Sequence, residues 1–170
     1  VQEWRKAGEM IGATSMHHLG YIDVILSNSD HREITDKVSQ LVKETVENRN
    51  NISIEFMSLD LNGYTGHIDH IVAGRSACLA FYRLREQGLP MSRIRLACLI
   101  RDEVPAVNTN FVFMEQGRTS DEIHETVDAR DLTDKIHEIM QVHHTQRADY
   151  ETVVAQKGDN IGINYFIVKD

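Results

Sequence analysis

The chain has 170 residues, 41% of them hydrophobic and 26% charged, a balance typical of a soluble globular protein and not of a disordered one. Its formal charge of −8 at pH 7 argues against a nucleic-acid partner, because phosphate binding needs clustered cations. No apolar run approaches the ~20 residues that cross a bilayer, so no membrane span is expected.

The first part of the chain predicts two helices. Apolar residues recur at helical spacing before a stop at Gly12; they are Trp4, Ala7, Met10 and Ile11. After a polar break, Asp30 and Glu33 have the spacing of a capping box that opens a second helix, which ends at residues 48–51. The expected buried face of this helix comprises Ile34, Val38, Leu41 and Val42, with Val46 as a further candidate.

Strands and helices alternate after that point. An apolar, β-branched run over residues 52–59 predicts a central strand, and a loop follows over 60–66. A long apolar helix is expected over 67–87, closed by Gly88 and Pro90, with a second strand over 95–100. Because such alternation builds βαβ units, we expect an α/β fold with a mainly parallel sheet, in a single domain over residues 1–170.

The last third predicts three weaker elements and a final strand. Residues 111–114 and 123–127 are candidate strands, and residues 161–168 form the last strand. Asp131 or Thr133 is expected to cap a helix whose apolar side holds Leu132, Ile136, Ile139, Met140 and His143. On that side, His143 is expected to be a hydrogen-bonded core histidine.

Cysteine and histidine usage gives two further expectations. Cys78 and Cys98 lie in an apolar helical stretch and an apolar strand and form no spacing motif, so we expect buried free thiols in a reducing compartment, the cytoplasm. The nine histidines are the unusual feature of the composition. Five have no partner spacing that assigns them to a site: His17, His18, His124, His137 and His144.

The stretch with the clearest chemistry is residues 63–70, Gly-Tyr-Thr-Gly-His-Ile-Asp-His. It follows a predicted strand, at the edge of a parallel sheet where sites are built. His67 and His70 are three residues apart and share one helix face, and neutral imidazole is a common zinc ligand. Asp69 could fix the tautomer of His67 only if His67 precedes the first helical turn. Taken alone, the pattern fits a metal or catalytic site and a polar helix start about equally well.

Residues 65–70 resemble the Gly-His-x-Asp-His motif of the PIG-L family, also called LmbE-like, of zinc-dependent N-deacetylases. Residues 19–23 resemble that family's short strand ending in a substrate-side aspartate, and residues 143–146 resemble its C-terminal His-x-Ser/Thr-Gln motif. Glu3, Ala7 and Gly12 resemble the helix after the family's first motif. The resemblance covers nearly the whole chain.

The resemblance implies a Rossmann-like, mainly parallel sheet with helices on both faces. It also implies removal of the acetyl group from a small N-acetylglucosamine-type sugar or glycoconjugate, by a protein that could form homo-oligomers. By the same resemblance His70 is a Zn²⁺ ligand, His67 protonates the leaving amine or stabilises the oxyanion, and Asp69 orients His67. Asp23 would lie near the sugar; it could equally well just end a strand.

The family's first motif, His-Pro-Asp-Asp, does not occur in this sequence. In the family it follows the first strand and supplies a histidine and an aspartate to zinc and a second aspartate as general base. We therefore expect the domain to lack its first strand, and the chain alone to bind zinc poorly and to be inactive. Asn164 replaces a glutamate of the family, and Thr65 stands where some members have a tyrosine. The alternative function is a catalytically inactive relative or fragment that binds a sugar or a protein.

Overall fold

The computed structural model describes residues 1–26, 29–104 and 117–170. The chain divides into two compact units. Residues 21–125 and 165–170 form the first, here called the sheet unit, and residues 1–20 and 126–164 form the second, the helical unit. Strands β3 (Glu125–Asp128) and β4 (Ile163–Lys169) run from one unit into the other.

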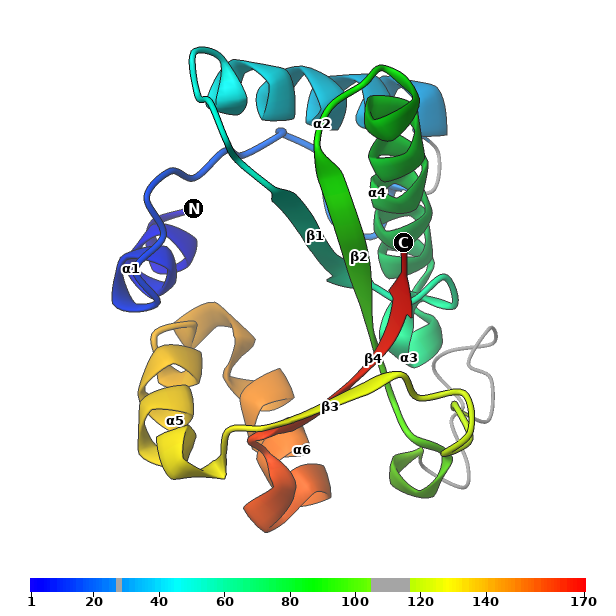
Figure 1. Ribbon diagram of the computed structural model, residues 1–170. Helices are drawn as coiled ribbons and strands as arrows, with labels where there is room; N and C mark the ends of the chain where they lie inside the picture. Colours follow the sequence, from blue (N-terminus) through cyan, green and yellow to red (C-terminus); the bar gives the residue numbers. More distant parts are fainter. Residues whose placement is uncertain (27–28, 105–116) are drawn as a thin grey trace. The chain divides into compact units, whose positions relative to one another are not determined.

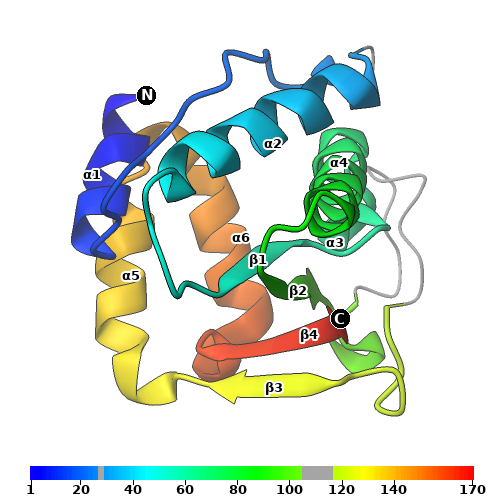
Figure 2. The same cartoon turned by 45° about the horizontal axis from the view of Figure 1, so that its top comes forward.

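Four strands form one sheet in the order β1-β2-β4-β3 (Figure 1). The strand β1 (Ile54–Leu59) and the strand β2 (Met91–Cys98) are parallel, as expected for a βαβ unit. The strand β4 is antiparallel to β2, with Cys98 opposite Tyr165, and Figure 2 shows β3 running alongside β4. The described sheet is therefore mixed, and the expected parallel order is seen only between β1 and β2. The candidate strand at 111–114 lies outside the described residues.

Two long helices belong to the sheet unit, α2 (His31–Val46) and α4 (Ile68–Glu86). Asp30 caps α2 as predicted, because its Oδ1 accepts a hydrogen bond from the main-chain N–H of Arg32 at 2.8 Å. The other half of the predicted capping box is wrong. Glu33 forms an ion pair with Lys37 at 2.7 Å and accepts a hydrogen bond from the Tyr21 hydroxyl. Both contacts are made by Oε1 of Glu33.

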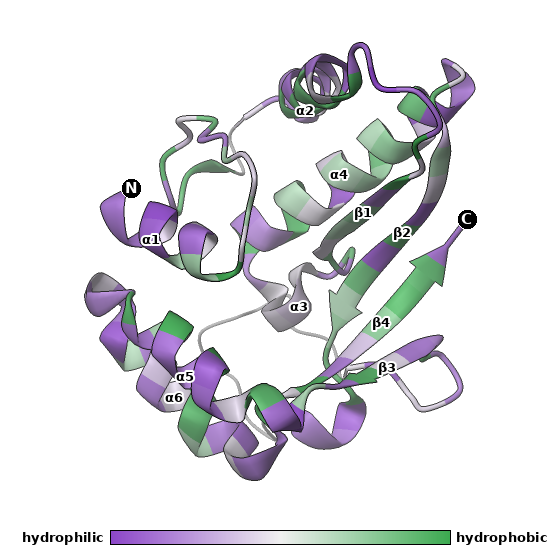
Figure 3. Cartoon of the chain, turned by 60° about the vertical axis from the view of Figure 1, so that its left-hand side comes forward, coloured by the Kyte–Doolittle hydropathy of each residue, from purple (hydrophilic) through white to green (hydrophobic). Residues whose placement is uncertain are grey.

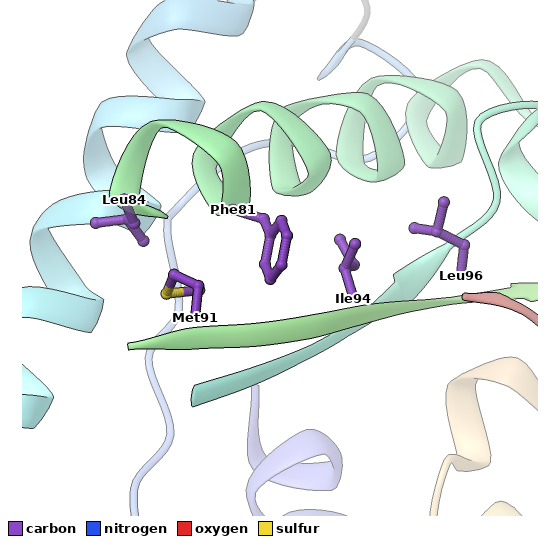
Figure 4. Close-up of a cluster of buried hydrophobic side chains, with 5 residues drawn as sticks. All are labelled: Phe81, Leu84, Met91, Ile94 and Leu96. Carbon is purple, nitrogen blue, oxygen red and sulfur yellow. The ribbon is translucent and has the colours of Figure 1, made fainter. Parts of the chain in front are cut away.

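The hydrophobic core of the sheet unit lies between α4 and β2. Figure 4 shows the side chains of Phe81 and Leu84 pointing from α4 toward the strand, where they meet Met91, Ile94 and Leu96. Four of these five side chains have no solvent exposure, and Met91 has 6%. Alternate residues of β2 face the helix because side chains alternate across a strand. At roughly 1.5–3 kcal/mol for each large apolar side chain, this cluster is the main stabilising contact between sheet and helix.

The opposite face of the sheet carries paired charges. Arg93 and Arg95 alternate with the buried residues of β2, so they lie on the side away from α4. Arg93 forms an ion pair with Glu55 of β1 at 2.9 Å, and Arg95 pairs with both Glu55 and Glu125. The sequence led us to expect an apolar sheet with helices on both faces. Within the sheet unit, the described helices α2 and α4 do not cover both faces in this way.

The helical unit contains α1 (Gln2–Met10), α5 (Thr133–Gln141) and α6 (Arg147–Lys157). In Figure 3, both hydrophilic and hydrophobic residues appear along α5 and α6. The carboxylate of Glu3 connects α1 to the turn before α6: it accepts hydrogen bonds from the hydroxyl of Thr145 at 2.6 Å and from its N–H at 3.2 Å. His137 and Tyr150 connect α5 to α6, with Nδ1 and the phenol oxygen 3.1 Å apart.

Several expectations for the helical unit are corrected. The helix α6 was not predicted at all. The predicted caps of α5 are wrong, because its N-cap is Leu132 and the hydroxyl of Thr133 instead donates to the carbonyl of Arg130 at 2.7 Å. Short 3₁₀ segments connect elements of the chain at Arg101–Glu103, Arg130–Leu132, His144–Gln146 and Gly158–Asn160.

Within the described ranges, none of the helices combines the length and the apolar character that crossing a bilayer requires.

Candidate functional site

The loop after β1 turns sharply before α4 begins. It contains a single helical turn, α3 (Gly63–Gly66), in which Gly63 and Gly66 both have positive φ. Tyr64 also has a positive φ, of 66°, which is unfavourable for a side chain with a Cβ and costs roughly 1–3 kcal/mol. The Asn62 side chain holds this conformation by accepting a hydrogen bond from the N–H of Tyr64 at 3.1 Å. The turn delivers the next residue, His67, to the start of α4.

His67 is the N-cap residue of α4. Its Nδ1 accepts a hydrogen bond from the main-chain N–H of Asp69 at 3.2 Å, which satisfies one of the free donors of the first helical turn. This bond makes Nδ1 the acceptor and leaves the proton of a neutral ring on Nε2. His67 thus precedes the first helical turn, which is the condition under which His67 and Asp69 can pair. Asp69, two residues after the N-cap, is buried, with 5% exposure.

His70 lies beside His67, with 4.8 Å between the ring centroids and a 40° tilt between the rings. The pKa of His70 is lowered, first by desolvation and then by the neighbouring His67, although the outer side of the ring remains exposed. A lowered pKa favours the neutral imidazole, which is the form that donates a lone pair to a metal ion. The two histidines of the motif are thus brought together as the helical spacing predicted.

Asp23 comes from a distant part of the sequence. Its negative charge acts on His70 and opposes the lowering of that pKa. A short strand was expected over residues 19–23. Residues 19–22 do not form a strand, and residues 23 and 24 form a turn. In this turn Asp23 Oδ1 accepts a hydrogen bond from the N–H of Val24 at 3.0 Å, and Val24 has a positive φ of 73°.

A buried carboxylate lies at the end of β1, where the loop toward His67 begins. The carboxylate of Asp60, which directly follows β1, is 1% exposed and pairs with the guanidinium of Arg118 at 2.7 Å. Arg118 also pairs with Glu122 at 3.2 Å. Burial raises the pKa of Tyr64 to about 12, so its phenol stays protonated at neutral pH. Sequence reasoning missed all of these residues, although an aspartate at the carboxyl end of a predicted strand was a usable signal.

The donor count limits what these residues can hold. Across the described residues, no three His, Cys, Asp or Glu side chains form a group that could bind a metal ion. The chemistry of His70 suits zinc, but a catalytic zinc site needs about three protein ligands. Within this chain, the described residues thus supply the right kind of donor in too small a number.

The C-terminal motif lies in the helical unit. His143 follows the end of α5, is partly exposed and lines a cavity, so it is not the core histidine on the apolar side of that helix. Thr145 and Gln146 belong to the 3₁₀ turn that precedes α6. Asn164 is an exposed residue of β4.

Comparison with known proteins adds no relative: no family model matches the chain, and no curated protein or solved structure matches it.

Proposed function

We propose that this protein takes part in the zinc-dependent removal of an N-acetyl group from an N-acetylglucosamine-type sugar or glycoconjugate, as the resemblance to the PIG-L family implies. The observation that carries the proposal is the close pair of His67 and His70 at the carboxyl end of β1. The charge of Asp23, which acts on His70 from a second segment that the same resemblance singles out, supports it.

Each residue of the site has a role in the proposed reaction. His70 would be the zinc ligand, because its lowered pKa keeps the imidazole neutral. His67, with its proton on Nε2, would stabilise the oxyanion of the amide by donating a hydrogen bond. To protonate the leaving amine instead, it would first have to take up a second proton and become an imidazolium. Asp69 would orient His67, and Asp23 would accept hydrogen bonds from sugar hydroxyls. Zinc, when bound, would polarise the amide carbonyl and lower the pKa of a water molecule.

By the resemblance, a complete zinc site would also need the His-Pro-Asp-Asp motif, which residues 1–170 do not contain. Such a segment would have to pair with β1, which is an edge strand and pairs only with β2 among the described strands. A strand added parallel to β1 would end beside residues 63–70, since the carboxyl ends of parallel strands lie at one sheet edge. This arrangement would extend the parallel pair β1 and β2 toward a Rossmann-like sheet.

The free thiols of Cys78 and Cys98 support a cytoplasmic setting for this activity.

The test compares acetate release and zinc content in the longest natural form of the protein, with and without a chelator. The His70→Ala variant should lose zinc and activity together. His67→Ala should keep its zinc and lose roughly 10²–10⁴-fold in kcat. His18→Ala, which changes an exposed histidine of the helical unit, is the matched control. Residues 1–170 alone should release no acetate and bind zinc weakly; chelator-sensitive turnover by them would contradict the proposed donor set.

The alternative function is a catalytically inactive module that binds a sugar or a protein. Zinc bound by the longest form, with no turnover on a broad panel of N-acetyl sugars, would support this alternative.

A further inference from the structure

Asn62 and Gly63 form the only Asn-Gly pair in the sequence, and they lie in the loop that leads to His67. In an open chain, an asparagine that precedes glycine deamidates faster than one that precedes another residue. The reason is that glycine has no Cβ to hinder the attack of its nitrogen on the neighbouring side-chain amide. Asn62 is partly exposed, so solvent water can reach its side chain.

Deamidation at this pair needs one backbone rotation. The Gly63 nitrogen forms a bond to Cγ of Asn62, the bond from Cγ to Nδ2 breaks, and ammonia leaves with the former amide proton of Gly63. Water then opens the five-membered imide at one of its two carbonyls and gives aspartate or isoaspartate. The ring can close only when the Gly63 nitrogen is nearly eclipsed with Cβ of Asn62 about the Cα–C bond.

The folded loop holds Asn62 in a different rotation. Its φ of −88° and ψ of 3° are those of the third residue of a type I turn, and the N–H of Gly63 closes that turn on the carbonyl of Asp60 at 2.7 Å. At this ψ the Gly63 nitrogen is eclipsed with the main-chain nitrogen of Asn62 and not with its Cβ. The side chain is also held, because Oδ1 of Asn62 accepts the N–H of Tyr64 at 3.1 Å.

The turn is fixed on both sides of Asn62. Before it, the N–H of Leu61 donates to Oδ1 of Asp60 at 2.7 Å, and the carbonyl of Leu61 accepts a hydrogen bond from Nε of Arg75 on α4 at 3.2 Å. After it, Gly63 is buried, and a Cβ there would lie 2.8 Å from both Cγ1 and the main-chain nitrogen of Ile71. A rotation about ψ of Asn62 must move one of these two flanks, so the loop has to open before the ring can close.

We propose that Asn62 is a deamidation site that the folded turn protects and that opening of the loop exposes. An aspartate product keeps an oxygen for the N–H of Tyr64. An isoaspartate product adds one methylene to the main chain before His67 and removes that residue from its place as the cap of α4. The modification therefore marks chains whose loop has been open. The inference does not rest on the proposed deacetylation, because deamidation needs neither zinc nor a substrate.

The first experiment incubates the full chain in mildly alkaline buffer, with and without guanidinium chloride. Peptide mass spectrometry follows the loss of the amide at each asparagine. In guanidinium chloride Asn62 should react fastest of all. In the folded chain its reaction should be slower by about tenfold or more, because protection increases with the rarity of opening. A smaller difference at Asn62, or a faster reaction of another asparagine in guanidinium chloride, would overturn the proposal.

The second experiment loosens the turn. Gly63→Ala places a Cβ at a φ of 78° against Ile71, so it should lower the ratio of the unfolded to the folded rate, a ratio that cancels the slower intrinsic reaction of an Asn-Ala pair. Gly88→Ala is the matched control, because Gly88 has a φ of 86° beyond the other end of α4 and its added Cβ would meet no atom within 4 Å. Arg75→Ala, which removes the hydrogen bond to the Leu61 carbonyl, is a milder change in the same direction.

Circular dichroism checks that each variant is folded. Ratios for Gly63→Ala and Arg75→Ala that equal that of the control would overturn the inference. A third measurement tests the product. Amide hydrogen exchange at Asp69 should be faster in the isolated isoaspartyl chain than in the Asn62→Asp variant, because only the first has a lengthened loop before His67. Equal exchange in the two would show that the modification does not disturb the helix cap.

Discussion

The guanidinium of Arg118 holds the buried carboxylate of Asp60 with two hydrogen bonds, 2.7 Å from Nε to Oδ2 and 3.2 Å from Nη2 to Oδ1. The pair joins residues 58 positions apart in the sequence, at the point where β1 ends and the loop toward His67 begins. Asp60 also fixes that loop, because its Oδ1 accepts the N–H of Leu61 at 2.7 Å.

Removing Arg118 should therefore destabilise the protein. Arg118→Ala leaves a carboxylate that is 1% exposed without its cation, which costs about 3 kcal/mol. Chemical denaturation measures the change in the free energy of unfolding. Arg83→Ala is the control, because Arg83 pairs at 3.3 Å with the exposed Asp36 and should change that free energy by less than about 1 kcal/mol. Equal effects of the two substitutions would show that Asp60 is not buried as described.

Gly74→Ala should destabilise the protein although alanine is the better helix former. An added Cβ at Gly74 would lie 2.6 Å from the carbonyl oxygen of Leu59 and 2.9 Å from that of Asp60, where α4 crosses the end of β1. In an open helix the change would stabilise by about 1 kcal/mol. Here we expect a loss of about 1–3 kcal/mol, because backbone atoms must move apart. A stabilised variant in thermal unfolding would contradict this close packing.

The two roles of His67 can be separated by substitution. His67→Ala removes the acceptor for the Asp69 N–H and should cost about 1 kcal/mol of stability. His67→Asn offers a preferred N-cap side chain and should recover most of that loss. If His67 also acts on the substrate, the asparagine variant stays inactive in acetate release. Restored activity in the stable asparagine variant would show that His67 acts only as a helix cap.

The titration of His70 should reflect its surroundings. Burial and His67 lower its pKa, so an NMR titration should give a midpoint below the usual value of 6.5. The unfolded chain binds this proton more readily than the folded one, so the stability from this group rises with pH between the two midpoints and is constant above about 6.5. His67→Ala should move the midpoint upward but not fully to 6.5, because desolvation remains. A midpoint at or above 6.5 in the unchanged protein would be inconsistent with this site.

Acid should loosen α1 from the rest of the helical unit. The pKa of Glu3 is lowered, first by its hydrogen bond to the Thr145 side chain. The contribution of this contact is complete above the ordinary glutamate pKa of 4.5 and is lost as the pH falls through the lowered value. The melting temperatures of the chain and of its Glu3→Ala variant should differ at pH 7 and converge in strong acid. A difference independent of pH would mean that the charge of Glu3 does not matter.

Sequence patterns predicted the elements that have clear apolar runs. Residues 52–59 and 67–87 gave β1 and α4 nearly to their ends, although β1 is an edge strand among those described, not a central one, and none of its residues is fully buried. The helix α6 was missed because all of its residues are exposed or only partly buried. The direction of β4 could not be predicted, since an apolar strand reads alike in a parallel and an antiparallel pair.

The candidate site was predictable only where its parts are local. The pairing of His67 with His70 follows from helical spacing alone. The support of Asp60 by Arg118 joins distant segments, and no spacing rule reports such a contact. The role of Asp23 near the sugar came from the family resemblance and stays a prediction, whereas the short strand that the resemblance implied before it is not present.

Both units combine early and late parts of the chain, which constrains how the protein is made. The helix α1 finds its partners among residues 126–164, and β2 pairs with β4 near the C-terminus. On a ribosome adding ~5–20 residues per second, α1 therefore emerges roughly seven to thirty seconds before the segment it packs against. Neither unit can complete its folding until the last strand has left the exit tunnel. Nascent chains stalled before residue 160 should accordingly be open to proteases and in need of chaperones.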